Sequence, residues 1–303
     1  MSFNENATLD TGQVEAGGGG GRLSGGFLPI GGGIGGLVVL VIFYALSQLT
    51  GGGSSPTQSG LSPGDVTGSG QVSQQISQCK TGADANRNTT CRVVGTVNSV
   101  QNYWTNALPK YGKRYTPAST VIYSGSTQSA CGTASNDVGP FYCPLDKKVY
   151  IDASFFDELT TRFGADSGAL AQEYVVAHEY GHHIQDILGL LDRAQQDPQG
   201  AQSGSVRVEL MADCLAGVWA NHAATTQDAN GQTLLKPLTR QDVQSALSAA
   251  QAVGDDRIQK RATGHINQDT WTHGSSAERQ RWFITGYQSG DLNKCDTFAA
   301  SSL

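Results

Sequence analysis

The sequence predicts an α+β domain, mostly helical with one small sheet, preceded by a single transmembrane helix. Three observations support this fold class. Several long segments place apolar residues at helical spacing, a short group of β-branched and aromatic runs lies between them, and an uncharged apolar stretch lies near the N-terminus. The 303 residues are enough for one sizeable core.

The apolar stretch predicts a membrane anchor. No charged residue occurs between Arg22 and Asp65, and residues 28–46 would form a helix of about 28 Å, close to the hydrocarbon thickness of about 30 Å. We therefore expect a transmembrane helix over residues 27–49. Gly31 and Gly35 have the spacing that lets two such helices approach closely, which permits a homodimer through the Gly-rich span.

A cleaved signal peptide is the alternative, with a small-residue site at residues 45–47. An uncleaved anchor is favoured because the segment before it is long, carries several acidic residues and has a single arginine, Arg22. That arginine, with no further basic residue until Lys80, places the N-terminus in the cytoplasm and the domain on the outer side of the membrane.

The flanks of the anchor are expected to lack a fold. Residues 1–26 include five consecutive glycines and predict a disordered segment. Residues 50–70 are rich in Gly, Ser and Pro and predict a flexible linker. The folded domain is then expected over residues 71–303.

Six cysteines, none in a C-x-x-C pair, are typical of disulfides in an oxidising compartment rather than of a zinc ribbon. They allow fifteen connectivities, among which the sequence cannot choose. Joining close neighbours would pair Cys79 with Cys91 and Cys131 with Cys143, leaving Cys214 for Cys295; free buried thiols are the alternative.

The charge is mildly acidic, with a formal net charge of −6 and a sequence pI near 5.4. Nucleic-acid partners normally require a basic stripe, so we expect none here. Lysines and arginines are also too scattered for a polybasic lipid-binding patch.

Within the domain, strands are expected at residues 121–123, 141–143 and 149–151. Helices are expected at residues 91–108, 154–163, 169–188, 206–224, 239–263 and 275–289, with Gly189 ending the third and capping boxes opening the last two.

The chemistry lies in the sequence His178-Glu179-Tyr180-Gly181-His182. Two histidines four residues apart lie within about 40° on one helix face, so both can bind one ion. Glu179 lies about 100° away from His178, where it can act as a general base on water beside a metal. The alternative is a chance motif on an exposed helix, but the flanking residues are apolar and a buried polar trio needs a partner.

A third ligand is expected from the helix at residues 206–224. Glu209 and Asp213 share one face of it, so we assign Glu209 to the metal and Asp213 to a ligand histidine's second ring nitrogen. The reverse assignment and two solvated carboxylates are the alternatives. Gln185 and Leu188 exclude the class of metallopeptidases that places glycine and histidine at these positions.

His273 enters the helix at residues 275–289 and is a candidate stabiliser of an oxyanion, or else a plain loop histidine. Tyr174 and Tyr287 are further candidates for the same role. His183 points to another face of its helix than the motif, and is expected to be a hydrogen-bonded polar residue rather than a ligand.

These motifs resemble the bacterial putative neutral zinc metallopeptidases over roughly residues 71–298. The resemblance is carried by residues 139–144, 149–152, 155–156, 177–183, 209–217, 273–276, 282–283 and 295–298. The sequence also has H-E-x-x-H followed by a helix with a glutamate and, four residues later, an aspartate. This pattern is similar to that of the thermolysin-like gluzincins.

The resemblance implies a zincin-like fold and one Zn²⁺ held by His178, His182 and Glu209. It also implies Glu179 as the base and Asp213 as the partner of a ligand histidine. A sheet edge beside the active helix, for which residues 149–152 are a candidate, would receive a peptide or protein substrate as an added strand. Because the family is bacterial, the orientation given by Arg22 and the cysteines predicts the outer side of a bacterial cytoplasmic membrane for this domain.

Three functions fit these observations: an anchored metallopeptidase, a zinc-dependent amidase or other hydrolase of an envelope component, or a non-catalytic assembly factor with a structural zinc. Glu179 favours the enzymes, because a closed structural site has no use for a carboxylate beside the metal and usually takes four protein ligands.

Overall fold

The computed structural model describes residues 1–18, 63–135 and 138–303. The expected transmembrane helix at residues 27–49 lies outside these residues. None of the helices within them is long and apolar enough to cross a membrane.

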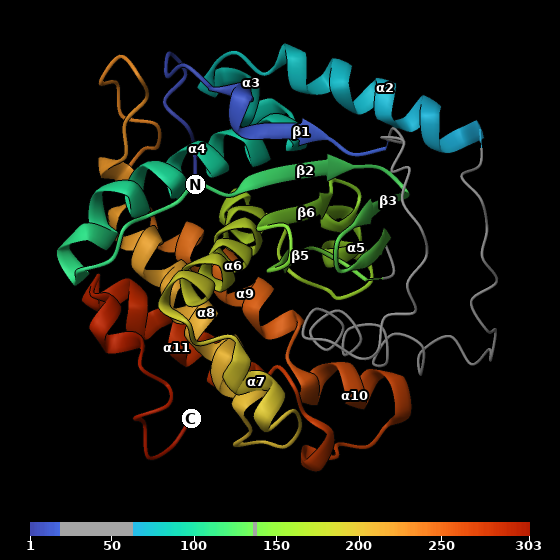
Figure 1. Cartoon of the computed structure of the whole chain (residues 1–303), viewed down its shortest axis with the longest axis vertical. Helices are drawn as coiled ribbons and strands as arrows, with labels where there is room; N and C mark the ends of the chain where they lie inside the picture. Colours follow the sequence, from blue (N-terminus) through green and yellow to red (C-terminus); the bar gives the residue numbers. More distant parts are fainter. Residues whose placement is uncertain (19–62, 136–137) are drawn as a thin grey trace.

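The described residues form a mostly helical α+β body, as expected (Figure 1). Its main sheet has the strand order β1-β2-β6-β5, in which β5 alone is antiparallel to its neighbour. A separate hairpin joins β3 and β4. The strands are β1 (Val14–Ala16), β2 (Ser119–Tyr123), β3 (Ser126–Ser129), β4 (Gly132–Ser135), β5 (Phe141–Cys143) and β6 (Lys148–Asp152).

The expectation that residues 149–152 form a sheet edge is wrong. They lie in β6, which pairs with β2 on one side and with β5 on the other. Val149, Tyr150 and Ile151 are all buried, as is typical of a strand covered on both faces. The edge strand on this side of the sheet is therefore β5, whose three residues are also buried.

Helix α6 lies at the centre of the body beside the sheet, and α2 lies along the outer strand β1 (Figure 1). Helix α6 contacts α4, α8 and α9, and α8 in turn contacts α11. The helices are α2 (Pro63–Gln78), α3 (Gly82–Arg87), α4 (Thr89–Ala107), α5 (Phe155–Thr161), α6 (Ala169–Leu188), α7 (Asp192–Gln196), α8 (Gly204–His222), α9 (Arg240–Ala252), α10 (Asp255–Thr263) and α11 (Ser276–Ser289).

The single helix expected over residues 239–263 is two helices. The capping box of Thr239 and Asp242 opens α9 as expected, but Gly254 is extended and begins α10 anew. A side chain at Gly254 would place its Cβ 2.4 Å from the backbone nitrogen of Ser276. The break therefore lets this turn lie directly against the start of α11.

The expected disorder of residues 1–26 is wrong for residues 1–18. Phe3 is fully buried, as is Ala7, and Leu9 is nearly so. Phe3 packs over Gly95 of α4, where an added Cβ would lie 2.5 Å from the Phe3 ring. The glycine run at residues 17–21 dominates the local composition, whereas the apolar residues before it supply the burial that orders the segment.

The expectation of a linker over residues 50–70 is wrong for residues 63–70, because these belong to α2, which begins at Pro63. Proline suits the first turn of a helix, where its missing N–H is not needed.

All six cysteines are paired as Cys79–Cys91, Cys131–Cys143 and Cys214–Cys295. This is the connectivity that joining close neighbours gives. The third bond ties α8 to the C-terminal turn at Leu292–Cys295.

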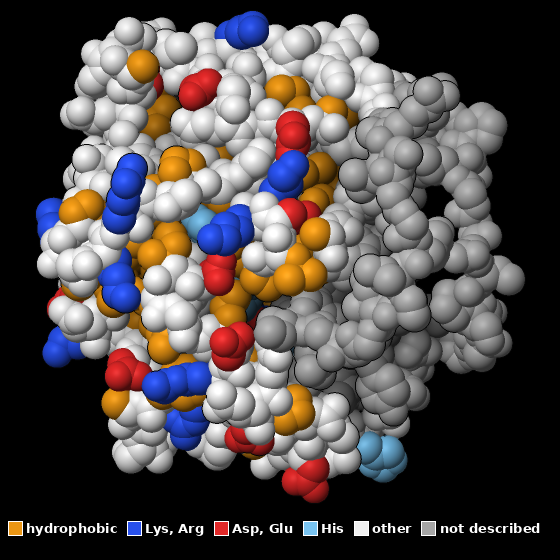
Figure 2. Space-filling view, in the orientation of Figure 1, with side chains coloured by type: hydrophobic (Ala, Val, Ile, Leu, Met, Phe, Trp, Pro, Cys, Tyr) orange, Lys and Arg blue, Asp and Glu red, His pale blue; other side chains and the backbone are white. Residues whose placement is uncertain are grey.

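The described part of the face in Figure 2 carries basic and acidic side chains interspersed over its surface. Two large apolar side chains are well exposed among the described residues, Leu145 at 58% and Ile266 at 50%.

The burial of Phe3 predicts that the N-terminal segment stabilises the domain. We expect Phe3→Ala to lower the free energy of unfolding by about 3–5 kcal/mol, because it leaves a cavity over Gly95. Ser2→Ala, at an exposed neighbouring position, is the matched control. Urea unfolding of both variants measures the difference, and a loss below about 1 kcal/mol for Phe3→Ala would show that the segment is not part of the cooperative fold.

Candidate metal centre

Helix α6 presents His178 and His182 side by side within the core. The two rings lie with their centroids 4.8 Å apart, and both side chains are buried. The helix is apolar over most of its length and ends at Gly189, whose left-handed backbone (φ 73°) closes its last turn.

Helix α8 supplies the facing carboxylate because α6 and α8 approach closely. Gly181 permits this approach, since an added Cβ would lie 3.0 Å from both the Cα and the carbonyl oxygen of Ala212. Glu209, one helical turn before Ala212, then faces the two histidines.

The three side chains converge on one point. Nε2 of His178 lies 3.2 Å from Oε2 of Glu209, and Nε2 of His182 lies 3.4 Å from Oε1. One ligand atom of each residue lies within 4.8 Å of the others, so the group could hold a metal ion. The structure thus brings together the three residues that the sequence assigned to the metal.

The other ring nitrogens are held by hydrogen bonds that orient both histidines. Nδ1 of His178 lies 2.8 Å from Oδ1 of Asp213, and Nδ1 of His182 lies 2.8 Å from Oε1 of Gln185. With Nδ1–H donating to these oxygens, a neutral imidazole would keep the lone pair of Nε2, the nitrogen that faces Glu209, for a metal ion.

Gln185 was not singled out by the sequence as a site residue. Its side-chain amide also donates to the carbonyl of Val208, 2.6 Å away on α8. It therefore fixes His182 and ties α6 to the turn that carries Glu209. The pattern that could have indicated it is its position three residues after His182, on the same helix face.

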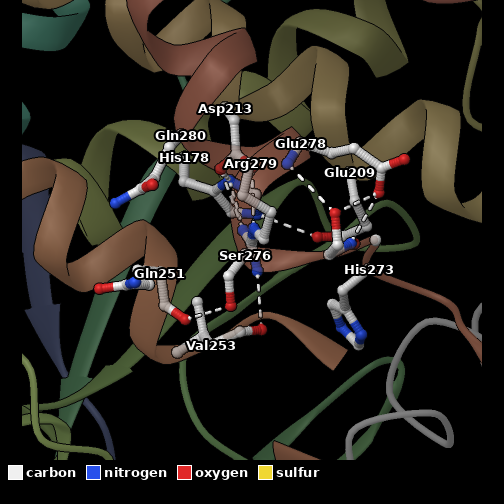
Figure 3. A network of polar contacts seen from close by, with 12 residues as sticks. His178, Glu209, Asp213, Gln251, Val253, His273, Ser276, Glu278, Arg279 and Gln280 are labelled. Carbon is white, nitrogen blue, oxygen red and sulfur yellow. Dashed lines mark hydrogen bonds and ion pairs between the residues drawn. The ribbon is translucent and has the colours of Figure 1, made fainter. Parts of the chain in front are cut away.

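Asp213 is the centre of a buried network that joins three helices (Figure 3). Arg279 of α11 donates from Nε to Oδ2 (2.8 Å) and from Nη2 to Oδ1 (3.0 Å), and Tyr174 donates to Oδ1 at 2.5 Å. Asp213 itself is fully buried. The hydroxyl of Tyr174, a candidate oxyanion stabiliser in the sequence, is therefore used in a hydrogen bond to Asp213. Arg279 is a site residue that the sequence did not indicate.

Arg279 reaches Asp213 because α8 and α11 pack with their backbones in contact. An added Cβ at Gly286 of α11 would lie 1.9 Å from the carbonyl oxygen of Cys214 on α8. A larger residue at Gly286 would push α11 outward and move Arg279 from its partner.

The carboxylates give the site a strong preference for positive charge. Burial lowers the pKa of His178, but Asp213 and Glu209 outweigh it and raise the pKa to about 10. Burial raises the pKa of Glu209, but His182 and His273 outweigh it and hold the pKa well below its usual range. A divalent cation between the histidines and Glu209 would compete with a proton for the same electrostatic stabilisation.

Glu179 lies beside the proposed ligands on α6 and is 7% exposed. Burial raises the pKa of this carboxyl, although His178 and His182 oppose the shift. The group is thus a stronger base than an exposed glutamate would be.

His273 lies on the loop that enters α11, on the same side of the network as Glu209 (Figure 3). Asp255, the first residue of α10, accepts through Oδ2 from the backbone N–H groups of Thr272 (2.7 Å), His273 (2.7 Å) and Gly274 (3.1 Å). Its Oδ1 lies 3.4 Å from Nδ1 of His273, and Oγ1 of Thr272 lies 2.9 Å from the same nitrogen.

Burial lowers the pKa of His273, but Glu209 and Asp255 outweigh it and raise the pKa above its ordinary value. The sequence indicated His273 but not Asp255, because Asp255 was placed in the middle of one long helix instead of at the start of α10.

The other histidines make contacts elsewhere. His183 lies 3.0 Å from the hydroxyl of Tyr142 and 2.7 Å from the carbonyl oxygen of Thr116, a hydrogen-bonded position like the one expected. His222 lies 3.0 Å from the carbonyl oxygen of Gly290, and His265 is exposed.

A helix with H-E-x-x-H and a glutamate from a second helix define a site of the zinc metallopeptidase class. The family described as "Putative neutral zinc metallopeptidase" matches residues 4–298, and the chain belongs to this family.

Several relatives share much of this chain. It is 56% identical over 229 residues to the uncharacterized protein Rv2575 of Mycobacterium tuberculosis, covering 75% of this chain and 77% of that protein. It is 43% identical over 208 residues to the uncharacterized protein YpfJ of Escherichia coli K12, covering 67% of this chain and 69% of that protein. No solved structure matches the chain.

The geometry predicts different metal losses for the two carboxylates of α8. We expect Glu209→Ala to lose zinc on dialysis, because it removes a ligand atom. Asp213→Asn should weaken zinc binding by about 10–100-fold, because it removes no ligand atom but weakens the hydrogen bond that orients His178. Zinc titration of both variants, with circular dichroism to check the fold, measures the contrast; equal or reversed losses would overturn the ligand assignment.

Proposed function

We propose that this protein is a zinc-dependent peptidase in which Glu179 activates the water that attacks a peptide bond. The observation that carries the proposal is the convergence of His178, His182 and Glu209 within 4.8 Å, with Glu179 adjacent on the same buried helix. The family to which the chain belongs supports the same reaction class.

The donor atoms fit zinc. Two imidazole nitrogens and one carboxylate oxygen, with both histidines oriented by second hydrogen bonds, are a common zinc ligand set. Three protein ligands also leave one coordination position for a reactant, as catalytic zinc sites do. When bound, zinc would polarise the scissile carbonyl and lower the pKa of water.

The chain's own groups would carry the proton and the developing charge. Glu179 takes the proton from the attacking water and returns it to the leaving amine, a role favoured by its raised pKa. His273 donates a hydrogen bond to the oxyanion, and Asp255 holds the loop that aims it.

We further propose a zincin-like arrangement in which the substrate adds to the edge strand β5. Tyr142 of β5 donates to Asp186 of α6 at 2.8 Å and contacts His183, so this edge lies against the proposed active helix. An extended peptide could pair with β5 through its backbone, which gives affinity with little dependence on sequence.

A structural zinc would leave Glu179 without a role. A raised-pKa carboxyl beside a site with three ligands favours catalysis over a closed metal site. Hydrolysis of another amide in an envelope component would use the same groups, and a cleavage profile over peptide libraries and cell-wall peptides separates the two enzymes.

We also propose that the domain works on the outer side of the cytoplasmic membrane, held there by the apolar segment at residues 27–49. Three disulfides support the oxidising compartment.

Glu179→Gln tests the reaction. The amide cannot accept the proton, so hydrolysis should fall by at least about 10²-fold, whereas zinc content should stay the same. Metal analysis and peptide cleavage by the same preparation measure both quantities. Full turnover in the zinc-loaded variant would defeat the mechanism.

His273→Ala tests the oxyanion role. We expect kcat to fall by about 10²–10³-fold with little change in KM, because the lost hydrogen bond forms only in the transition state. His265→Ala, at an exposed histidine, is the matched control. An unchanged kcat would show that His273 does not stabilise the oxyanion.

A further inference from the structure

The N-terminal segment, residues 1–18, is built into the domain over its whole length. Its backbone pairs first with the loop before α9, where the N–H of Asn4 donates to Leu234 at 2.9 Å. It then pairs with the turn before α3, where Leu9 donates to Lys80 (2.9 Å) and Gly82 donates to Ala7 (2.8 Å).

Helix α4 holds the next part of the segment. Asn98 accepts from the backbone N–H of Asp10 at 2.8 Å and donates to its carbonyl at 2.9 Å. A side-chain amide that satisfies both backbone groups of one residue is a specific contact, because both Asp10 groups would otherwise need other partners.

The segment ends as a strand of the main sheet. Val14, Glu15 and Ala16 pair in parallel with Thr120, Val121 and Ile122 of β2, and Gly17 donates to the Ile122 carbonyl at 2.7 Å. Removing the segment would uncover the β2 edge and the surface of α4 under Phe3.

The chain re-enters the described structure next to the point where it left. Helix α2, which begins at Pro63, packs against β1, and Cys79 at its C-terminal side is bonded to Cys91 of α4. Figure 1 shows the end of β1 and the start of α2 on the same flank of the molecule. The connection formed by residues 19–62 thus starts and ends on one body.

We infer that residues 1–18 and the catalytic domain lie on the same side of the membrane. A cytoplasmic N-terminus with an outer domain would require the chain to cross the membrane once between them. The inference excludes such a single crossing. A single crossing would separate β1 from β2 and Phe3 from Gly95, with the loss of the contacts above.

The connection that contains the apolar residues 28–46 therefore leaves from and returns to one side. This inference stands on the packing of residues 1–18 and does not depend on the proposed peptidase activity.

A cysteine pair across the docked segment tests it. Thr8 and Thr81 are opposed in an antiparallel bridge between two backbone hydrogen bonds, where Cα atoms lie about 4.5 Å apart. A disulfide spans about 4.4–6.8 Å, and all six native cysteines are already paired. The full-length chain with Thr8→Cys and Thr81→Cys is expressed in bacteria and studied in isolated membranes. A protease site inserted after residue 52 allows the N-terminal fragment to be cut from the domain.

After cleavage, we expect most N-terminal fragments to stay joined to the domain on a denaturing gel without reductant, and to separate with it. Thr8→Cys alone and Thr81→Cys alone are the controls. The bond cannot form across a bilayer, so its formation in the double variant supports the inference.

Labelling of the single Thr8→Cys variant gives a second, independent measurement. A membrane-impermeant maleimide should reach Cys at this exposed position from the side on which added protease reaches the domain. Labelling only from the opposite side, together with an unlinked double variant, would overturn the inference.

Discussion

The carboxylate of Asp213 is the contact on which the centre of this structure depends. It accepts hydrogen bonds from His178 of α6 and Arg279 of α11 while it is itself part of α8. A buried carboxylate is tolerated only when charge and hydrogen bonds compensate its desolvation, and here Arg279 makes the largest single contribution, followed by His178. The three helices therefore meet at one ionic junction, and the orientation of His178 is set by the same junction.

This junction requires backbones that approach closely. Gly181 brings α6 onto α8, where an added Cβ would make a tight contact, and Gly286 brings α11 onto α8, where no side chain would fit. The distances in the candidate metal centre thus follow from helix packing as much as from the side chains that would hold the ion. Because interiors are close-packed, a change at either glycine would shift the proposed ligands without altering any of them.

Much of the candidate site could be predicted from the sequence. The apolar periodicity and Gly189 predict both ends of α6 correctly. The four-residue spacings of His178 with His182 and of Glu209 with Asp213 place each pair on one helix face. These are local properties of single helices. Arg279 and Asp255 could not be found this way, because each acts on a residue far away in the sequence.

The fold was predictable to a similar extent. The helices expected from the sequence and the three strands at residues 121–123, 141–143 and 149–151 have strong local patterns. The short or weakly patterned elements α2, α3, α7, β1, β3 and β4 were not expected, and the order of strands in the sheet depends on contacts between distant segments. The N-terminal segment was misjudged because Phe3, Ala7 and Leu9 are too sparse to form a periodic pattern. Their burial is determined by a surface of α4 that only the folded domain presents.

The bond between Cys214 and Cys295 spans a sequence separation of 81 residues, within which lie α9, α10 and α11. Closing a ring of this size removes conformational freedom from the unfolded chain worth about 4–5 kcal/mol in the entropic account. Asp255, His273 and Arg279 all belong to this ring, and Cys214 directly follows Asp213. A backbone break near the exposed Ile266 would therefore leave both pieces covalently joined around the candidate metal centre.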